Sequence, residues 1–328
     1  MRPTFQAFFI LALLSAFFGG NFILRGASVL SYHNDSSSSG VNSYETVLTP
    51  ANLTVSTFSK QYSTPVDGQI YAQPLYVPSV VVTSGPQAGT HNLAIVATQH
   101  DSLYAIDANS GVIIWHTSFL TSGLTGATAI TSVPATDTLS NNISPEVGIT
   151  GTPVIDGTTN LLYVVAKTKQ IINGVTASPS YVFTLYKIDI TNGNATANAN
   201  IAGSTVIADT VYNGTTFSYQ TNTNPAAAQD PFVVGTGDGA ITIGGQSRVY
   251  LNALREAERP GLILSNGVVY VNFGSHGDNG PYHGWMLGFN KTSLAITAVL
   301  NLTPNGGLGG FWGGGASRSR MPAAIFMR

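Results

Sequence analysis

A glycine-rich segment at residues 274–285 concentrates side chains that could bind a ligand. Its candidate ligand-binding residues are His276, Asp278, Asn279, Tyr282, His283 and Trp285. The four glycines of the segment would allow a ligand to approach the backbone closely. An aromatic ring such as Tyr282 or Trp285 could stack on a sugar or on a flat cofactor. A metal site would instead use the two imidazoles and the Asp278 carboxylate, but their spacing matches no defined metal motif.

The same residues also have an ordinary structural interpretation. Asp278 and Asn279 are residue types that bond the backbone of their own turn. The histidines could satisfy contacts between neighbouring sheets, and Trp285 could pack as the first residue of a strand. The sequence leaves both interpretations open, and it assigns no metal-ligating residue.

Three further ligand-binding candidates lie earlier in the chain, at His100, Asp101 and Glu146. A His-Asp pair between two strands is also typical of a hairpin turn, and an isolated acid such as Glu146 can cap a turn. A nucleophile, a base and an orienting acid cannot be assembled from the sequence. We therefore predict neither a catalytic residue nor a resident cofactor.

These candidates are positioned by a repeated unit of short β-strands. Three copies span residues 73–115, 151–193 and 259–300. Each copy begins with an apolar strand beside a proline, and its third strand ends at Asp or Asn before a tight turn. Strands rich in Val, Ile and Tyr between Gly, Asn, Asp and Ser are typical of antiparallel sheets. A four-stranded unit that recurs and cannot bury its faces alone predicts a β-propeller.

The expected fold class is all-β, an incomplete β-propeller of four-stranded antiparallel blades with about three to four recognisable blades. A degenerate fourth blade could lie within residues 203–250. Residues 28–312 would form the blades. Residues 313–328 form an atypical basic tail, which we interpret as the mark of a truncated or frame-shifted product.

Propeller geometry predicts where a site should lie. Successive strands of a blade alternate in direction, so the loops after the second strands and the connections between blades emerge on one rim. Long excursions concentrate on that rim, at residues 121–148, 167–180, 203–258 and 274–284. Long loops on one face of a rigid scaffold are where binding usually occurs.

One charged stretch within these excursions, residues 252–260, has a structural interpretation. It predicts a short helical turn with exposed ion pairs, Arg255 with Glu258 or Glu256 with Arg259. Exposed pairs of this kind contribute little to stability, and buttressing is a better explanation for them than catalysis.

The composition limits the possible partners. Hydrophobic residues make up 43% of the chain but charged residues only 9%, so the surface must be largely Ser, Thr, Asn, Gln and Gly. A net charge of −2 gives no electrostatic footprint for nucleic acid. The chain has no cysteine, which excludes disulfide bonds and thiolate metal sites. The expected partner is a small molecule, a glycan or a surface protein.

The N-terminus predicts export. Arg2 precedes an apolar run at residues 7–18, which has the length of a signal-peptide core and is short for a membrane span of about 20 residues. Residues 1–27 are therefore a signal peptide or an N-terminal anchor, and only an uncleaved segment would contact a membrane. The expected location is secreted, periplasmic or extracellular. Possible glycosylation triplets, which chance could also produce in this composition, begin at Asn34, Asn52, Asn142, Asn194, Asn213, Asn290 and Asn301.

Two runs of the repeat support a resemblance to a known family. Residues 103–115 (Leu-Tyr-Ala-Ile-Asp-Ala-Asn-Ser-Gly-Val-Ile-Ile-Trp) and 149–154 (Ile-Thr-Gly-Thr-Pro-Val) resemble the pyrroloquinoline-quinone repeat of the quinoprotein alcohol dehydrogenase-like superfamily. Residues 31–35 and 49–53 are similar to the lead-in before the first blade of that family. The resemblance covers most of residues 31–312. It is specific for the propeller and much less so for chemistry, because the same repeat builds dehydrogenases and non-catalytic scaffolds.

The resemblance implies two alternative functions. The first is an extracytoplasmic binding or scaffold module for a carbohydrate or a surface partner. The alternative is an alcohol or sugar dehydrogenase, which would use pyrroloquinoline quinone with calcium, an Asp base and commonly a vicinal disulfide. The chain cannot form that disulfide, and Lys167 and Lys169 stand where a calcium-binding Glu of the family is expected. We therefore rank the binding module first.

Overall fold

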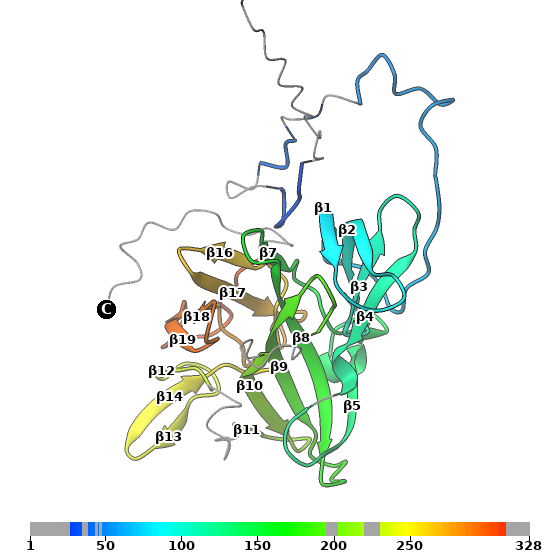
Figure 1. Cartoon of the computed structure of the whole chain (residues 1–328). Helices are drawn as coiled ribbons and strands as arrows, with labels where there is room; N and C mark the ends of the chain where they lie inside the picture. Colours follow the sequence, from blue (N-terminus) through cyan, green and yellow to red (C-terminus); the bar gives the residue numbers. More distant parts are fainter. Residues whose placement is uncertain are drawn as a thin grey trace, which may run out of the picture.

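The computed structural model describes residues 27–34, 39–42, 45, 48–121, 123–194, 203–219 and 230–312. Within these ranges the regular structure is β, apart from two short 3-10 helices, η1 (Phe119–Thr121) and η2 (Ala135–Thr138). The strands form four sheets, and every strand pair is antiparallel (Figure 1). The all-β fold class is confirmed, and the arrangement of the sheets is consistent with an incomplete β-propeller. Residues 1–26 of the predicted N-terminal segment 1–27, and the whole predicted tail at residues 313–328, lie outside the described residues.

The first and third blades have the predicted four strands. In the first blade the strands lie side by side in chain order: β1 (Leu75–Val82), β2 (Gly89–Ala97), β3 (Ser102–Asp107) and β4 (Ile113–Ser118). The third blade has the same order: β16 (Ile263–Ser265), β17 (Val268–Ser275), β18 (Trp285–Asn290) and β19 (Ile296–Asn301). A short strand β15 (Glu256–Ala257) pairs with the end of β17.

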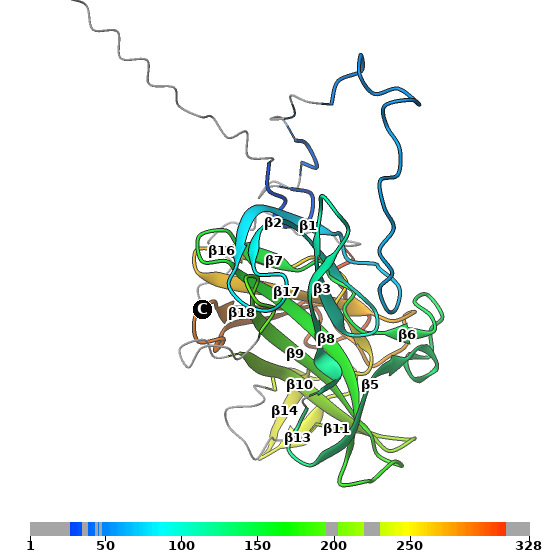
Figure 2. The ribbon, with the colours of Figure 1, turned by 45° about the vertical axis from the view of Figure 1, so that its right-hand side comes forward.

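The second blade is larger than predicted. Its four central strands are β7 (Val154–Asp156), β8 (Leu161–Ile172), β9 (Ser180–Asp189) and β10 (Ser204–Tyr212). Additional strands extend this sheet: β5 (Ala127–Pro134) pairs with β8, β6 (Glu146–Val147) with β5, and β11 (Phe217–Tyr219) with β10. The long strands curl into a half-barrel, which the rotated view makes visible (Figure 2).

Two sequence-based expectations about this blade were wrong. Residues 167–180 were expected to form a loop, but β8 and β9 continue to pair as far as Gln170 and Ser180. Most side chains along β8 and β9 are buried, on both faces of the sheet. Burial on both faces favours a continued strand over an exposed loop. Residues 203–258 were expected to form an excursion between blades, but residues 204–212 form β10, the fourth strand of the second blade.

The remaining sheet is small. It contains β12 (Phe232–Val234), β14 (Gln246–Tyr250) and β13 (Ile241–Ile243), in that order. β12 also contacts β19 of the third blade. The three strands of this sheet fall within residues 232–250, the later part of the region where a degenerate fourth blade was expected.

The core lies between the blades. Successive side chains of β8 point to opposite faces, so Tyr163 and Val165 join the cluster shared with the third blade, while Leu162 and Val164 join the cluster shared with the first. Phe183 of β9 meets Phe273 of β17 edge to face, with ring centroids 5.1 Å apart. The second blade is therefore buried on both faces, as the middle blade of a stack must be.

The turns after the third strands are built alike in all three blades. A side-chain oxygen of Asp107, Asp189 or Asn290 accepts a hydrogen bond from the backbone amide two residues later, at 3.0, 2.9 and 2.9 Å respectively. Asp and Asn favour such turns because their short side chains can reach the backbone of the next residues. The three copies of the repeat therefore share this hydrogen bond in the turn as well as the order of their strands.

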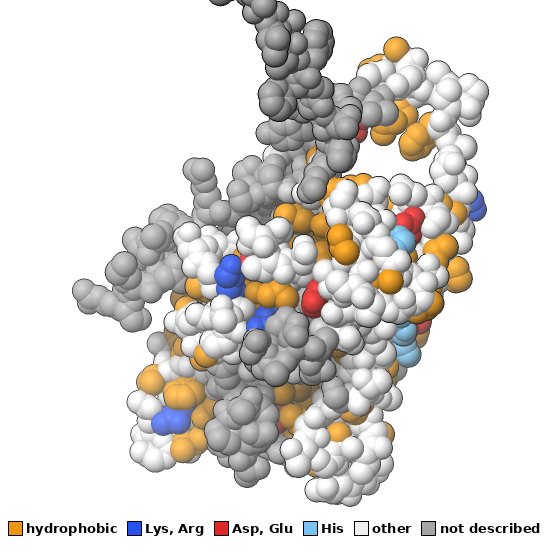
Figure 3. Space-filling model, in the orientation of Figure 1, with side chains coloured by type: hydrophobic (Ala, Val, Ile, Leu, Met, Phe, Trp, Pro, Cys, Tyr) orange, Lys and Arg blue, Asp and Glu red, His pale blue; other side chains and the backbone are white. Residues whose placement is uncertain are grey.

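The surface is polar but carries few charges. Figure 3 shows one face on which uncharged side chains and backbone predominate. Among the glycosylation triplets, Asn301 is buried, whereas exposed positions are Asn52, Asn142, Asn194, Asn213 and Asn290. No helix in the described part of the chain is long and apolar enough to cross a membrane.

Candidate functional site

The long excursions meet on one rim, as propeller geometry predicts. Asn279, in the loop after β17, donates a hydrogen bond from Nδ2 to the carbonyl oxygen of Leu139 at 2.9 Å. The Nε2 atom of His283 lies 2.9 Å from the carbonyl oxygen of Asp238, in the connection that precedes the third blade. Three excursions far apart in the sequence therefore pack against one another.

His100 and Glu146, two of the predicted site residues, are brought together. The Nδ1 atom of His100 lies 2.9 Å from Oε1 of Glu146. Both side chains remain partly accessible, with 44% of the His100 side chain and 25% of the Glu146 side chain exposed. This pair joins the first blade to the connection leading into the second.

Asp101 has a structural position. Its side chain is fully buried, and its Oδ1 atom accepts a hydrogen bond from the backbone amide of Lys167 at 3.1 Å. Burial raises the pKa of Asp101 well above its usual range, although the bond from Lys167 acts in the opposite direction. The contact connects the first blade to the second and leaves Asp101 out of reach of solvent.

His276 contacts a buried lysine. The Nζ atom of Lys167, whose residue is only 1% exposed, lies 2.8 Å from Nε2 of His276. Lys167 also donates hydrogen bonds to the carbonyl oxygens of Glu256 at 2.8 Å and Leu254 at 3.2 Å. Burial lowers the pKa of His276 well below its usual range, and the neighbouring Lys167 lowers it further. His276 is therefore a buried, neutral contact between blades.

Two buried glutamates complete this region. Glu256 accepts a hydrogen bond at Oε1 from the backbone amide of His283 at 2.7 Å, and Glu258 accepts one at Oε2 from the amide of Gly151 at 3.2 Å. Burial raises the pKa of both glutamates well above the usual range. The turn expected within residues 252–260 is present at residues 253–255, where the Glu256 amide donates a hydrogen bond to the carbonyl oxygen of Asn252 at 2.9 Å. The expected exposed ion pairs were wrong, because Arg255, Glu256 and Glu258 are buried.

Trp285 is also enclosed. It is the first residue of β18, none of its surface is exposed, and it belongs to the core between the second and third blades. The structure thus places Trp285 in packing and separates it from the solvent-accessible residues of the same loop.

A shallow hollow of about 500 Å³ remains open beside this loop. It is lined by Asp278, Tyr282, Leu308 and Trp312. The Tyr282 hydroxyl donates a hydrogen bond to Oδ1 of Asp278 at 2.9 Å, and the Tyr282 and Trp312 rings meet edge to face with centroids 6.4 Å apart. Trp312 is 53% exposed, so its ring is available to a ligand.

The backbone around the hollow is strained at two positions. Asp278 and Leu308 have φ values of 56° and 62°, in the left-handed region that non-glycine residues seldom adopt. The Leu308 amide donates a hydrogen bond to the carbonyl oxygen of Tyr282 at 3.2 Å, which ties the two sides of the hollow together. Strain of this kind is often found where a ligand is held.

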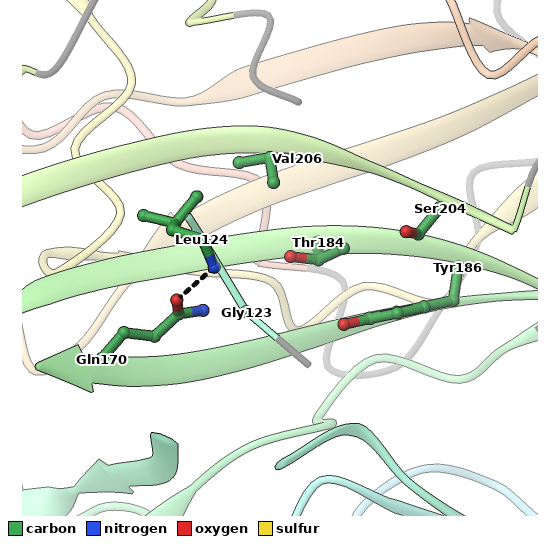
Figure 4. Close-up of a pocket in the computed structure, with 7 residues that line it drawn as sticks. All are labelled: Gly123, Leu124, Gln170, Thr184, Tyr186, Ser204 and Val206. Carbon is green, nitrogen blue, oxygen red and sulfur yellow. Dashed lines mark hydrogen bonds between the residues drawn. The ribbon is translucent and has the colours of Figure 1, made fainter. Parts of the chain in front are cut away.

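A second cavity is too small for an organic ligand. It has a volume of about 60 Å³ and lies over β8, β9 and β10, where Gln170 accepts a hydrogen bond from the Leu124 amide at 2.7 Å (Figure 4). Each water molecule occupies about 30 Å³ of liquid volume, so this space fits one or two waters.

The residues of the rim do not suit calcium at the position that the family resemblance implies. The amino group of Lys167 fills the space between the carbonyl oxygens of Leu254 and Glu256 and the ring of His276. The amino group takes the space that an ion would need, and its hydrogen bonds use the oxygen atoms that would otherwise be ligands. Within the described residues, no group of three or more His, Asp and Glu side chains is placed to hold a metal.

Sequence reasoning missed four residues that define this region: Glu256, Glu258, Leu308 and Trp312. The glutamates carried no signal, because acids in a charged stretch are normally exposed. Trp312 did carry a signal in the sequence. It stands in a Gly-rich run after the last strand of the repeat, where an aromatic residue has no sheet to pack into.

Comparisons with known proteins show only a weak similarity of fold. No family model and no curated protein matches the chain. Among solved structures, it is similar to a europium-containing methanol dehydrogenase, with 11% identity, a TM-score of 0.31 and coverage of 72% of this chain and 36% of that chain. A quinohemoprotein alcohol dehydrogenase from Pseudomonas putida HK5 gives 7% identity, a TM-score of 0.31 and coverage of 71% and 31%. BamB from Moraxella catarrhalis gives 12% identity, a TM-score of 0.18 and coverage of 73% of this chain and 60% of that chain.

The chain spans about a third of the length of the two dehydrogenases. At these identities and TM-scores the similarity concerns the arrangement of strands and does not extend to the residues of a site. The strand pairings by themselves define the class, an all-β protein whose sheets are consistent with an incomplete propeller.

Proposed function

We propose that this protein is an extracytoplasmic binding module that holds a carbohydrate in the hollow between Asp278 and Trp312. The observation that carries the proposal is the exposed Trp312 ring beside the hydrogen-bonded Tyr282 and Asp278 pair. A flat aromatic surface can pack against the C–H face of a sugar, and a carboxylate can accept hydrogen bonds from its hydroxyl groups.

The other rim residues support binding rather than chemistry. His276 and Asp101 are buried and bonded to Lys167, and His283 is held by Glu256 and Asp238. Side chains engaged in this way hold the excursions in place. A solvent-accessible ligand can reach Asp278 and Trp312 but not the buried groups behind them.

The proposed location rests on the sequence. An apolar run near the N-terminus and a surface poor in charge are usual for exported all-β proteins. The dehydrogenase alternative has less support, because Lys167 fills the position where the resemblance implies a calcium-binding Glu.

A binding assay against an oligosaccharide array, followed by calorimetry on the best sugar, tests the proposal. The variant Trp312→Ala should weaken binding by about ten-fold or more, since loss of a stacking ring in a central position commonly costs over 1 kcal/mol. Val234→Ala is the matched control, because Val234 is exposed to a similar extent on a different sheet. Equal sugar affinity in wild type and Trp312→Ala would refute the site.

The redox alternative needs its own measurement. Wild-type protein is mixed with pyrroloquinoline quinone and calcium, and dye reduction is followed with alcohols and sugars. We expect no reduction above the protein-free background. Reduction that depends on the protein and is lost in Asp278→Ala would replace the binding module with the dehydrogenase.

A further inference from the structure

We propose that the amino group of Lys167 is a built-in substitute for a bound cation, filling a site that all three blades create on the rim. The proposal is independent of the ligand in the hollow. This polar site is buried beneath the rim, and neither the repeat nor the resemblance assigns it to a lysine.

The contacts of Lys167 reach both neighbouring blades. Its backbone amide bonds Asp101 of the first blade, and its side chain bonds the carbonyl oxygens of Leu254 and Glu256 at the entry to the third blade. The same Nζ atom lies 2.8 Å from Nε2 of His276, the residue that directly follows β17. One residue of the second blade therefore links the other two.

The acceptors around Nζ form a site for a positively charged or strongly donating group. Two carbonyl oxygens and an imidazole nitrogen converge on one point, and each can accept one of the hydrogens of the amino group. Burial lowers the pKa of Lys167 well below its usual range and Arg255 adds to this shift, whereas Glu256 and Asp101 act against it. The ring of Phe183, 5.0 Å from Nζ, adds a further surface that attracts a cation.

This arrangement explains why a buried lysine can be retained. A lysine buried without partners is strongly unfavourable, but one whose hydrogens are all accepted recovers much of that loss. Removing only the amino group would leave the buried carbonyl oxygens of Leu254 and Glu256 without their donor, and such groups are costly.

Two substitutions separate the amino group from the space it occupies. Lys167→Met keeps most of the side-chain volume and removes the donor, whereas Lys167→Ala also opens a cavity. We expect both variants to melt at least about 5 °C below wild type. Added n-propylammonium should raise the melting temperature of Lys167→Ala by about 3 °C by occupying the cavity, with no rise for wild type or Lys167→Met.

Tetramethylammonium is the matched control ligand, because it carries the same charge but cannot donate a hydrogen bond. It should not stabilise Lys167→Ala. A melting temperature of Lys167→Met equal to that of wild type would overturn the proposal, as would equal stabilisation by the two ammonium ions.

A measurement on the unaltered protein keeps the proposal testable if the variants do not fold. Reductive methylation followed by mass spectrometry reports how accessible each amino group is. Lys167 should react at least about ten-fold more slowly than the exposed Lys60, because modification requires the rim to open. Methylation of both lysines at the same rate would show that the site is not closed around Nζ.

Discussion

Gly193 lies so close to the indole of Trp115 that a Cβ atom added to the glycine would sit 2.6 Å from the ring. Trp115 lies in β4, the last strand of the first blade, and Gly193 lies in the turn after β9, the third strand of the second. The indole nitrogen donates a hydrogen bond to the carbonyl oxygen of Ile190 at 2.9 Å, and the Thr117 hydroxyl bonds the carbonyl oxygen of Gly193. The last strand of the first blade, β4, is therefore hydrogen-bonded to the turn after β9 in the second blade.

Replacing Gly193 with alanine should therefore separate the two blades at this point. The added methyl group meets an enclosed ring, and overpacking of this kind costs about 1–3 kcal/mol. Gly193 also has a φ of 74°, which a side chain disfavours. Urea denaturation of Gly193→Ala should show a lower midpoint than that of wild type.

Gly174→Ala is the control for backbone strain. Gly174 has a φ of 75°, but no heavy atom lies within 4 Å of its added Cβ atom. The variant Gly174→Ala has the unfavourable φ but no steric clash, so it should be destabilised less than Gly193→Ala. Equal losses in the two variants would mean that the contact with Trp115 contributes nothing.

The turns show how much of the fold the sequence could reveal. Asp107, Asp189 and Asn290 each follow a β-rich run and precede Gly or Ser, so local chemistry alone identifies the ends of three third strands. Such signals depend only on neighbours in the chain. They located the blades but could not reveal β10, whose pairing with β9 spans a long and weakly patterned connection.

The candidate site was harder to predict than the strands, because sequence signals depend only on neighbours in the chain. Polar residue types drew attention to His100 and Glu146, and the fold does bring them together. Burial, however, depends on contacts between blades. Lys167 and Trp285 look accessible by residue type or by position in a loop, and only the packing of the second and third blades encloses them.

The ion pair between Lys291 and Asp156 should make stability depend on pH. Burial raises the pKa of Asp156, but the bonds from Lys291 and Thr158 outweigh it and lower the pKa to about 2. Since the folded pKa lies below the unfolded value of about 3.9, the contribution is complete above about pH 4 and is lost as the pH falls towards 2.

Lys291→Met should reduce this contribution by about 1 kcal/mol at pH 6, a value that allows for solvent screening of the partly exposed lysine. The difference between variant and wild type should shrink as the pH falls below 4. Lys60→Met, in an exposed segment, is the control for loss of charge and should leave the pH profile unchanged. A constant difference from pH 6 to pH 2 would contradict the role of Asp156.

Asp209 should have the opposite pH dependence. It is buried in β10, and burial together with the neighbouring Asp230 carboxyl raises its pKa to about 8. The folded protein then keeps a proton that the unfolded chain releases near pH 4, so stability should fall as the pH rises from about 4 to 8. This pH dependence of stability should disappear when the Asp209 carboxyl group is replaced by a neutral group of the same shape.

Asp209→Asn should accordingly stabilise the protein, by about 1–3 kcal/mol at pH 8 and by much less at pH 4, because a buried carboxylate without a full set of partners is costly. Guanidinium denaturation at both pH values measures the difference. Asp189→Asn is the matched control, since Asn290 already performs the same turn bond in the third blade. If Asp209→Asn were less stable than wild type at pH 8, the side chain would be an ionised partner in the fold and the protonated state inferred for β10 would be wrong.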